Sequence, residues 1–246
     1  YIDIGTHIGQ EFSSFNISRR KILTKYIKHN LISFFSSRHK FISPNKFLAL
    51  LNSCKYIKSN NKQIFAILIE PNFKLLHSKP YNDADVVIQA SISSKKDESI
   101  CLNKLFMPVF DKNSQSSSLY KEKFNFDTNH ITTLSINPCK IFEIIKNYIE
   151  SLDITYSDII LRINNEGNED ECIYALYETF KEKNIHIMGS LEDVLKIKGN
   201  NAFKKLNQFL TEKKLSTCRF NTLLHSWIES TYLIKNLLKE NQSDEK

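Results

Sequence analysis

Short runs of apolar residues recur along this chain, and most of them end at an acidic or turn-forming residue. Runs of this length that are rich in Ile and Val are typical of parallel strands buried on both faces of a sheet. The pattern predicts strands at residues 1–4, 64–69, 85–90, 131–136, 158–163, 185–188 and 216–220.

Between several of these runs, apolar residues return at the spacing of an amphipathic helix. Helices are expected at residues 19–35, 44–56, 138–152, 169–183, 191–197 and 201–213, and a strand or a helix at 227–238. Strands that alternate with helices predict an α/β fold with a mostly parallel sheet and helices on both faces. In such folds, ligands bind at the carboxyl ends of the strands.

The length of 246 residues and the hydrophobic content of 41% suit one domain over residues 1–240, followed by a frayed tail at 241–246. The chain starts with Tyr1 inside a strand and without Met, so we expect that its N-terminus is truncated. No apolar run is long enough to span a bilayer. Five scattered cysteines without a C-x-x-C pair indicate reduced thiols, a cytoplasmic location and no metal site.

The formal charge of +7 is unevenly distributed, because residues 12–69 hold eleven Lys and Arg and no Asp or Glu. We interpret residues 12–62 as a basic helical insertion after the first strand. Its charge fits a solvated face, an anionic acceptor such as an acidic glycan, or a membrane surface, since the helix at 19–35 is amphipathic and basic. Nucleic acid is less favoured, because the interleaved aromatic residues also fit ordinary core packing.

The first strand runs into a turn with two glycines four residues apart, Gly5 and Gly9. Glycine is favoured where the backbone turns sharply or touches a ligand. Asp3 beneath this turn would repel a pyrophosphate but could accept hydrogen bonds from an amine. His7 stands where a dinucleotide fingerprint needs its second glycine, so the turn disfavours NAD and favours S-adenosylmethionine. A chance strand–helix turn is the alternative.

Two further strands end in an acid, Glu70 and Glu166. In a doubly wound sheet, these ends and Asp3 would lie along one edge. The Glu70 carboxylate could accept from both hydroxyls of a ribose, while a surface acid at a strand end is the plainer interpretation. Pro71 fixes the turn that follows. Gln89 and Ala90 end the third strand, where they could meet an adenine edge or form an ordinary polar loop.

Five motifs now stand in order over residues 1 to about 180. They are Asp3-Ile4-Gly5-Thr6-His7-Ile8-Gly9-Gln10, Ala66-Ile67-Leu68-Ile69-Glu70-Pro71-Asn72, Ala90-Ser91-Ile92-Ser93, Ser116-Ser117-Ser118-Leu119, and Leu161-Arg162-Ile163-Asn164-Asn165-Glu166-Gly167-Asn168-Glu169. Together they resemble the FkbM-type S-adenosylmethionine-dependent methyltransferases. The resemblance implies a Rossmann-like methyltransferase fold, S-adenosylmethionine as methyl donor, and O-methylation of a saccharide or natural-product hydroxyl.

The predicted site combines these motifs. The candidates that would hold the cofactor are Asp3, Gly5, Thr6, His7, Gly9, Glu70, Pro71, Asn72, Gln89 and Ala90. Asn164, Glu166 and parts of 91–130 would face the acceptor, with Glu166 or His7 as the base that takes its proton and Glu169 as a further possible base.

The chain also departs from the family pattern. Thr6-His7 stands in place of Ala-Asn, and Asn164 replaces an Asp; an amide takes up no proton at neutral pH. The gap between the first two motifs is longer than is usual in the family. These departures leave open a non-catalytic module with the same fold, or a nucleic-acid-binding protein that uses the basic insertion.

Overall fold

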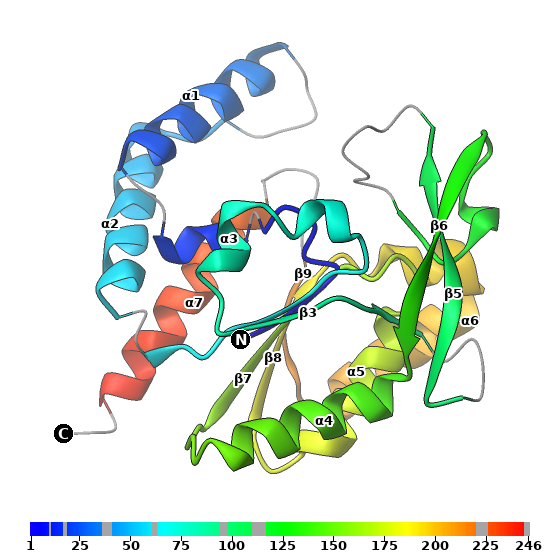
Figure 1. Ribbon diagram of the computed structural model, residues 1–246. Helices are drawn as coiled ribbons and strands as arrows, with labels where there is room; N and C mark the ends of the chain where they lie inside the picture. The colour runs from blue at the N-terminus through cyan, green and yellow to red at the C-terminus, as the bar shows by residue number, and fades with distance from the viewer. Residues whose placement is uncertain are drawn as a thin grey trace. The chain divides into compact units, whose positions relative to one another are not determined.

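The computed structural model describes residues 1–9, 11–16, 19–35, 41–60, 63–93, 98–109, 117–219 and 226–243 (Figure 1). The chain divides into two compact units. The first contains residues 1–8 and 66–217, and the second contains residues 9–65 and 218–246. The expected insertion at 12–62 thus forms most of the second unit, which also contains the C-terminal residues.

A six-stranded sheet has five of its strands and the first two residues of the sixth in the first unit. Its strands in spatial order are β3 (Val86–Ile88), β2 (Ile67–Ile69), β1 (Ile2–Ile4), β7 (Asp158–Ile163), β8 (Asn184–Gly189) and β9 (Ser216–Arg219). The neighbouring pairs from β3 to β8 are parallel, which confirms the predicted α/β class with a mostly parallel sheet. The strand order reverses between β1 and β7, and such a switch point opens a crevice at the carboxyl ends of the strands.

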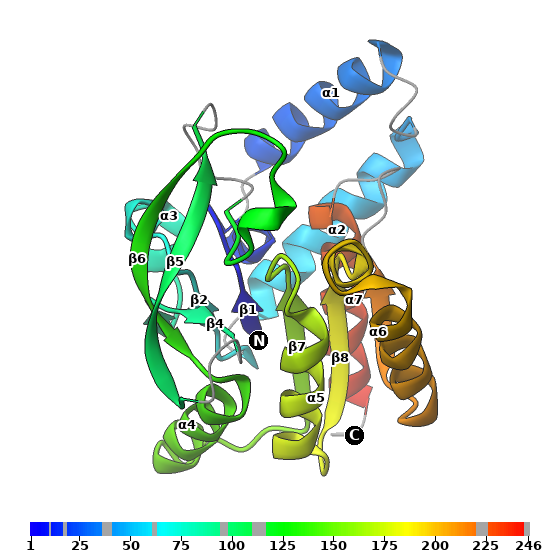
Figure 2. The ribbon, with the colours of Figure 1, turned by 90° about the vertical axis from the view of Figure 1, so that its right-hand side faces the viewer.

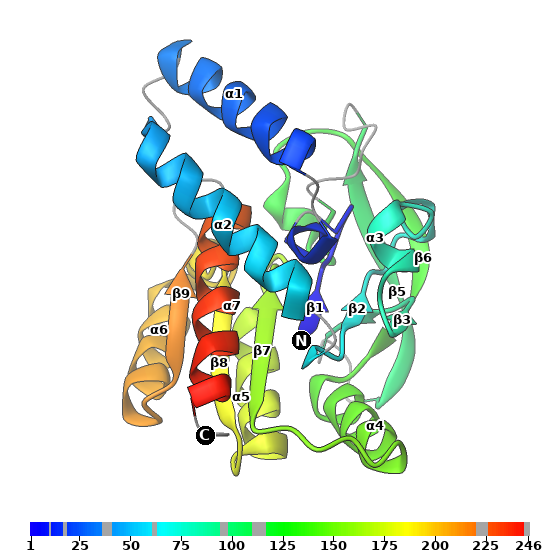
Figure 3. The same ribbon diagram turned by 90° about the vertical axis from the view of Figure 1, so that its left-hand side faces the viewer.

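One face of this sheet is covered by α5 (Glu169–Phe180), which lies against β7 and β8 (Figures 2 and 3). The helices α4 (Pro138–Ser151) and α6 (Glu192–Glu212) pack on either side of α5. Asn137 caps α4 as its sequence position suggests, because its side chain accepts from the backbone N–H of Cys139 at 2.9 Å. Gly199 has φ +83° and interrupts α6, which explains why the sequence predicts two helices there.

A second, three-stranded sheet in the same unit consists of β4 (Ser91–Ile92), β6 (Thr128–Ile136) and β5 (Ile100–Pro108), in that order. β5 and β6 pair antiparallel along their whole length, so the region 91–130, expected as a loop or a hairpin, contains a long hairpin. An isolated bridge between Phe106 and Ser118 folds the connecting segment back onto β5. Residues 73–75 and 121–123 form the short 3-10 helices η3 and η4, and Lys79–Asn82 forms α3.

The second unit is helical and contains η1 (Phe12–Asn16), α1 (Arg19–Phe35), α2 (Pro44–Asn60) and α7 (Ser226–Ser243). Its core joins Ile22 of α1 to Leu50 and Cys54 of α2 and to Ile228 of α7. The helix bounds of α1 confirm the prediction, and α7 settles the strand-or-helix alternative in favour of a helix. α7 extends to Ser243, within the expected tail at 241–246, and residues 244–246 lie outside the described part.

A buried ion pair links the two strands that flank the switch point. Asp3 of β1 and Arg162 of β7 are register partners, and their side chains meet at 3.1 Å between Oδ1 and Nη1. Asp3 is fully buried and Arg162 is 6% exposed. The same Nη1 donates to the carbonyl oxygen of Gly5 at 2.6 Å, so the guanidinium also holds the turn that follows β1.

Because a buried charge without its partner is strongly destabilising, Arg162→Met is expected to lower the free energy of unfolding by about 3–5 kcal/mol. The double variant Asp3→Leu/Arg162→Met should recover much of that loss, since it removes both charges. Lys140→Met, which breaks an exposed Lys140–Glu143 pair, is the control and should change it by less than about 0.5 kcal/mol. Urea unfolding measures all three, and a loss of under about 1 kcal/mol in Arg162→Met would contradict a constraining role for the pair.

Candidate functional site

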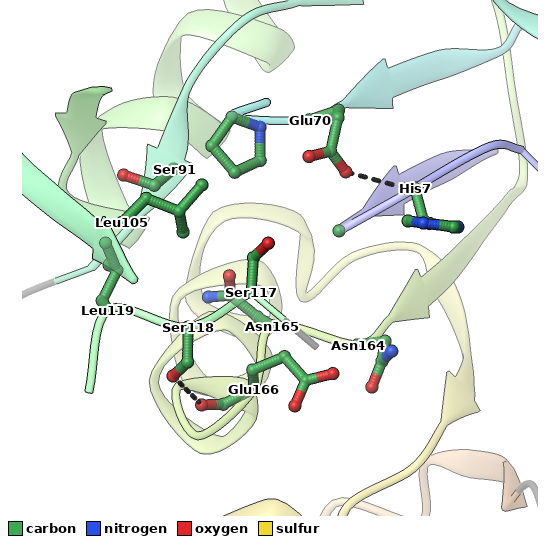
Figure 4. Close-up of a pocket in the computed structure, with 12 residues that line it drawn as sticks. His7, Glu70, Ser91, Leu105, Ser117, Ser118, Leu119, Asn164, Asn165 and Glu166 are labelled. Atoms are coloured by element: carbon green, nitrogen blue, oxygen red, sulfur yellow. Dashed lines mark hydrogen bonds between the residues drawn. The ribbon is translucent and has the colours of Figure 1, made fainter. Parts of the chain in front are cut away.

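A cleft lies at the carboxyl ends of the strands in the first unit, at the switch point between β1 and β7 (Figure 4). It has about 480 Å³ of empty space, part of which is open to solvent. The loops after β1, β2 and β7 form one side, and β4, β5 and the segment after β5 form the other. The lining residues are Gly5, His7, Glu70, Pro71, Ser91, Leu105, Ser117, Ser118, Leu119, Asn164, Asn165 and Glu166.

Gly5 is the position in this cleft where the backbone admits no side chain. Its φ is +67°, and a Cβ atom would lie 2.1 Å from the carbonyl oxygen of Asn164. Its N–H donates to the carbonyl of Ile69 at 3.0 Å, which ties the β1 turn to the end of β2. The close approach of the β1 and β7 loops therefore depends on glycine here, as the sequence pattern predicts.

His7 contributes mainly through its backbone. Its φ is +54°, in the left-handed region that non-glycine residues seldom adopt. Its N–H donates to Oε2 of Glu70 at 2.8 Å, and its carbonyl accepts from the hydroxyl of Tyr81. His7 is half-exposed and lines the cleft. Its position is therefore compatible with a turn residue and with a base, the two roles that the sequence suggests.

Glu70 presents a buried carboxylate at the end of β2, and Figure 4 shows it facing the cleft beside His7. The residue is 5% exposed, and its Oε1 accepts from the N–H of Asn72 at 2.9 Å. Burial raises the pKa of Glu70 to about 7, against the effect of the two backbone N–H donors and Arg162. Each carboxylate oxygen can accept more than one hydrogen bond, so capacity remains for donors from a ligand.

Asp3 and Thr6, both predicted to hold the cofactor, lie beneath the turn and do not line the cleft. The Asp3 carboxylate accepts from Arg162 and, at 3.0 Å, from the hydroxyl of Tyr1. The Thr6 hydroxyl donates to the carbonyl of Asp3 at 2.9 Å. The amine acceptor that the sequence suggested is therefore already paired with a guanidinium inside the fold.

The other predicted cofactor residues divide into two groups. Pro71 lines the cleft, whereas the Asn72 side chain caps η3 by accepting from the N–H of Lys74 at 3.2 Å. Exposed Gln89 and buried Ala90 are not among the lining residues, and Ser91 takes the corresponding place. Gly9 has φ +69° and is the first residue of the second unit.

Glu166 lies on the loop after β7, between Asn164 and α5, and lines the cleft. Its φ is +55°, and its backbone carbonyl accepts from the hydroxyl of Ser118 at 3.2 Å. Its carboxylate is ion-paired with Lys123 of η4, whose Nζ also lies 3.6 Å from Asp193. Burial lowers the pKa of Lys123. The predicted base thus has a cation beside it that the sequence pattern did not indicate.

Glu169, the further possible base, is fully buried and does not line the cleft. Its carboxylate accepts from the N–H of Gly167 at 2.9 Å, and burial raises its pKa to about 7. Four residues of the site escaped sequence analysis: Arg162, Lys123, Ser118 and Asn165. Arg162, Ser118 and Asn165 lie inside motifs quoted above, and Lys123 lies in the region 91–130, but nothing in one sequence distinguishes them from their neighbours.

No protein family, curated protein or solved structure matches this chain. The fold and the cleft define an α/β protein whose mostly parallel sheet carries an acidic cleft at its switch point. Among the residues that the structure describes, no group of three or more His, Cys, Asp or Glu side chains is placed to hold a metal ion. The charged and polar groups that the cleft presents are Glu70, Glu166 and the polar side chains around them.

Gly5→Ala is expected to lower the free energy of unfolding by about 3 kcal/mol, because the new Cβ atom must displace the Asn164 carbonyl as well as adopt a left-handed φ. Gly199→Ala is the matched control: its φ is also positive, but no atom lies within 4 Å of the added Cβ. The control should lose only about 1 kcal/mol in the same denaturant titration. Equal losses in the two variants would remove the argument for a close approach at Gly5.

Stability is expected to fall as the pH rises from about 5 to about 8. The folded pKa values of Glu70 and Glu169, about 7, lie above their ordinary value of 4.5, so both groups favour the folded state when protonated. That contribution is fully present below the unfolded pKa and is lost as the pH passes the folded pKa. Urea midpoints across this range measure the slope.

Glu169→Gln stays neutral at every pH and should flatten this profile, whereas Glu178→Gln on the exposed side of α5 should leave it unchanged. A profile that Glu169→Gln leaves as steep as in the wild type would show that this carboxyl group is not buried as described.

Proposed function

We propose that this protein binds S-adenosylmethionine in the switch-point cleft and transfers its methyl group to an oxygen acceptor, a hydroxyl of a saccharide or a related small molecule. The observation that carries the proposal is the Glu70 carboxylate at the end of β2, facing the cleft beside the glycine turn. The order of the five sequence motifs supports it, since each of them supplies at least one residue that lines the cleft.

Glu70 suits a ribose because hydroxyl groups are donors and a carboxylate accepts them. The backbone N–H groups of His7 and Asn72 fix the orientation of the carboxylate, so little ordering is needed when a diol arrives. A phosphate at this edge would meet the Glu70 carboxylate, and no Lys or Arg is among the lining residues; Lys123, which lies beside Glu166, is already paired with that carboxylate. A nucleoside that carries a cation fits the charge of the cleft better than a nucleotide.

Asp3 takes a positioning role under this proposal. Because Arg162 pairs with Asp3 and also donates to the Gly5 carbonyl, the two side chains hold the turn on which the ligand would lie. Because Gly5 has no side chain, the backbone of the β1 turn is accessible from the cleft. Pro71 fixes the turn that follows β2. These residues would bind and orient the cofactor, and they take no part in the methyl transfer itself.

The bound cofactor would supply an electrophilic methyl group on a sulfonium. The chain must hold the acceptor oxygen in line and accept its proton. Glu166 is the proposed proton acceptor, because its carboxylate lines the cleft and its backbone is fixed by Ser118. The Lys123 ammonium pairs with that carboxylate and would hold it in place at the edge of the cleft. Asn164, on the same loop as Glu166, would form a hydrogen bond with the molecule that receives the methyl group.

A binding module without turnover is the second candidate, and the same corner of the cleft favours it. Asn164 stands where the resembled family has an acid, and Glu166 is engaged by Lys123. A protein with these features would keep cofactor affinity but transfer nothing. The two candidates differ only in activity, so binding and turnover have to be measured separately.

Calorimetric titration with S-adenosylmethionine and S-adenosylhomocysteine is expected to show binding that Glu70→Ala weakens about 10- to 100-fold, the loss typical of hydrogen bonds to a charged group. Binding should be tighter at about pH 8 than at about pH 6, because only the ionised Glu70 carboxylate accepts from both hydroxyls. The control is Glu178→Ala, which removes an exposed acid from α5 and should leave the affinity unchanged.

Adenosine and AMP, titrated under the same conditions, separate nucleoside from phosphate recognition. Tighter binding of AMP than of adenosine, or equal affinities in Glu70→Ala and wild type, would overturn the proposed cofactor site. Binding that persists while no methyl group is transferred to any sugar in a radiolabelled acceptor screen would favour the non-catalytic module.

A further inference from the structure

The helix α1 of the second unit has two apolar faces. One face packs inside that unit: Ile22 is buried in its core, and the Tyr26 ring stacks on Phe47 of α2 at 4.2 Å. Asn30 on the same face brackets the backbone of Ile42, with its side chain both donating to the carbonyl and accepting from the N–H. The inward face of α1 therefore packs within the second unit.

The outward face carries five large apolar side chains that are open to solvent. They are Leu23 (46% exposed), Ile27 (49%), Leu31 (55%), Phe34 (78%) and Phe35 (82%). Residues four apart lie on one side of a helix, so Leu23, Ile27 and Leu31 form a stripe that ends at the two phenylalanines. Exposed apolar residues are common singly, but a contiguous row of this size marks an interaction surface.

Basic residues accompany this stripe. Arg20, Lys21 and Lys28 of α1 are exposed, and residues 12–69 contain eleven Lys and Arg without one Asp or Glu. The burial of Leu, Ile and Phe stabilises a complex with an apolar partner, whereas the charge selects an anionic one. The partner has to offer both properties on one surface.

We infer that α1 lies on the surface of an anionic lipid bilayer, with the stripe from Leu23 to Phe35 at the boundary between headgroups and acyl chains. A basic helix with an apolar face binds in this way. A second copy of the chain would bring the same positive charges together, and a nucleic acid has no apolar surface for Ile27 and Leu31. No helix among the described residues is long and apolar enough to cross a bilayer, so α1 would bind in the plane of the membrane.

Co-sedimentation with vesicles tests this inference on the full chain. Phosphatidylcholine vesicles that contain phosphatidylserine are expected to bind the protein, and vesicles of phosphatidylcholine alone much less, since each basic residue near an anionic surface contributes about fivefold in affinity. Added salt should weaken the binding. The double variant Ile27→Glu/Leu31→Glu should reduce it by about tenfold or more, because the stripe can no longer enter the apolar region.

Ile144→Glu/Leu152→Glu is the matched control. Ile144 on α4 and Leu152 just after it are 40% and 44% exposed, and the control changes the net charge by the same amount as the α1 variant. It should bind vesicles far better than the α1 variant does. Circular dichroism and thermal unfolding of both variants establish that they are folded; an α1 variant that unfolds is replaced by Phe34→Ser/Phe35→Ser, with the same expected loss.

Three results would overturn the inference. The first is equal binding of the two double variants to anionic vesicles. The second is no binding to these vesicles while a mixed-sequence RNA is bound through α1. The third is a dimer in sedimentation velocity that the α1 variant converts to a monomer and that does not bind vesicles. None of these outcomes depends on whether S-adenosylmethionine binds in the cleft.

Discussion

The buried pair of Asp3 and Arg162 is the constraint on which the rest of the first unit depends. A guanidinium and a carboxylate in the interior are tolerable only when each is satisfied by the other and by further hydrogen bonds. The Nη1 atom of Arg162 reaches from β7 to Asp3 and to the Gly5 carbonyl, and Asp3 also accepts from Tyr1. The ends of β1 and β7 are thereby held together at the point where the strand order reverses.

Strain in the cleft is distributed over two non-glycine residues with left-handed backbones, His7 on the loop after β1 and Glu166 on the loop after β7. Such a conformation costs about 1–2 kcal/mol for each residue, so other interactions must offset it. On the His7 side, the Glu70 carboxylate and the Tyr81 hydroxyl bind the backbone; on the Glu166 side, the Ser118 hydroxyl does. Strained positions with such support are frequent at sites that bind or react.

Much of this fold is readable in the sequence, because apolar periodicity and turn residues act locally. The carboxyl end of β1, the cap of α4, the break near Gly199 and the role of Gly5 follow from residues close together in the chain. Contacts between residues that lie far apart in the sequence cannot be predicted in this way. Arg162 meets Asp3 across 159 positions, and one sequence gives no sign that the acid beneath the turn is already engaged.

The same limit applies to the partners of other predicted residues. Lys123 pairs with Glu166 because the segment after β5 folds back over the β7 loop, and Ser91 rather than Gln89 reaches the cleft because β4 joins a second sheet. The apolar spacing of α1 shows two possible faces, but which of them packs depends on α2 and α7. These features belong to the tertiary arrangement and become visible only in the structure.

The second sheet gives the cleft two walls of different origin. The β1, β2 and β7 loops rise from strands buried on both faces, so their residues are fixed by the core. The opposite wall, with Leu105 and Ser117 to Leu119, belongs to the β5–β6 hairpin and the segment that joins its strands, and Leu102 and Leu134 of that hairpin are open to solvent. Under the proposed function, the hairpin wall can change its side chains, and with them the acceptors that fit, while the β1 and β2 loops that would hold the cofactor and Glu166 on the β7 loop stay in place.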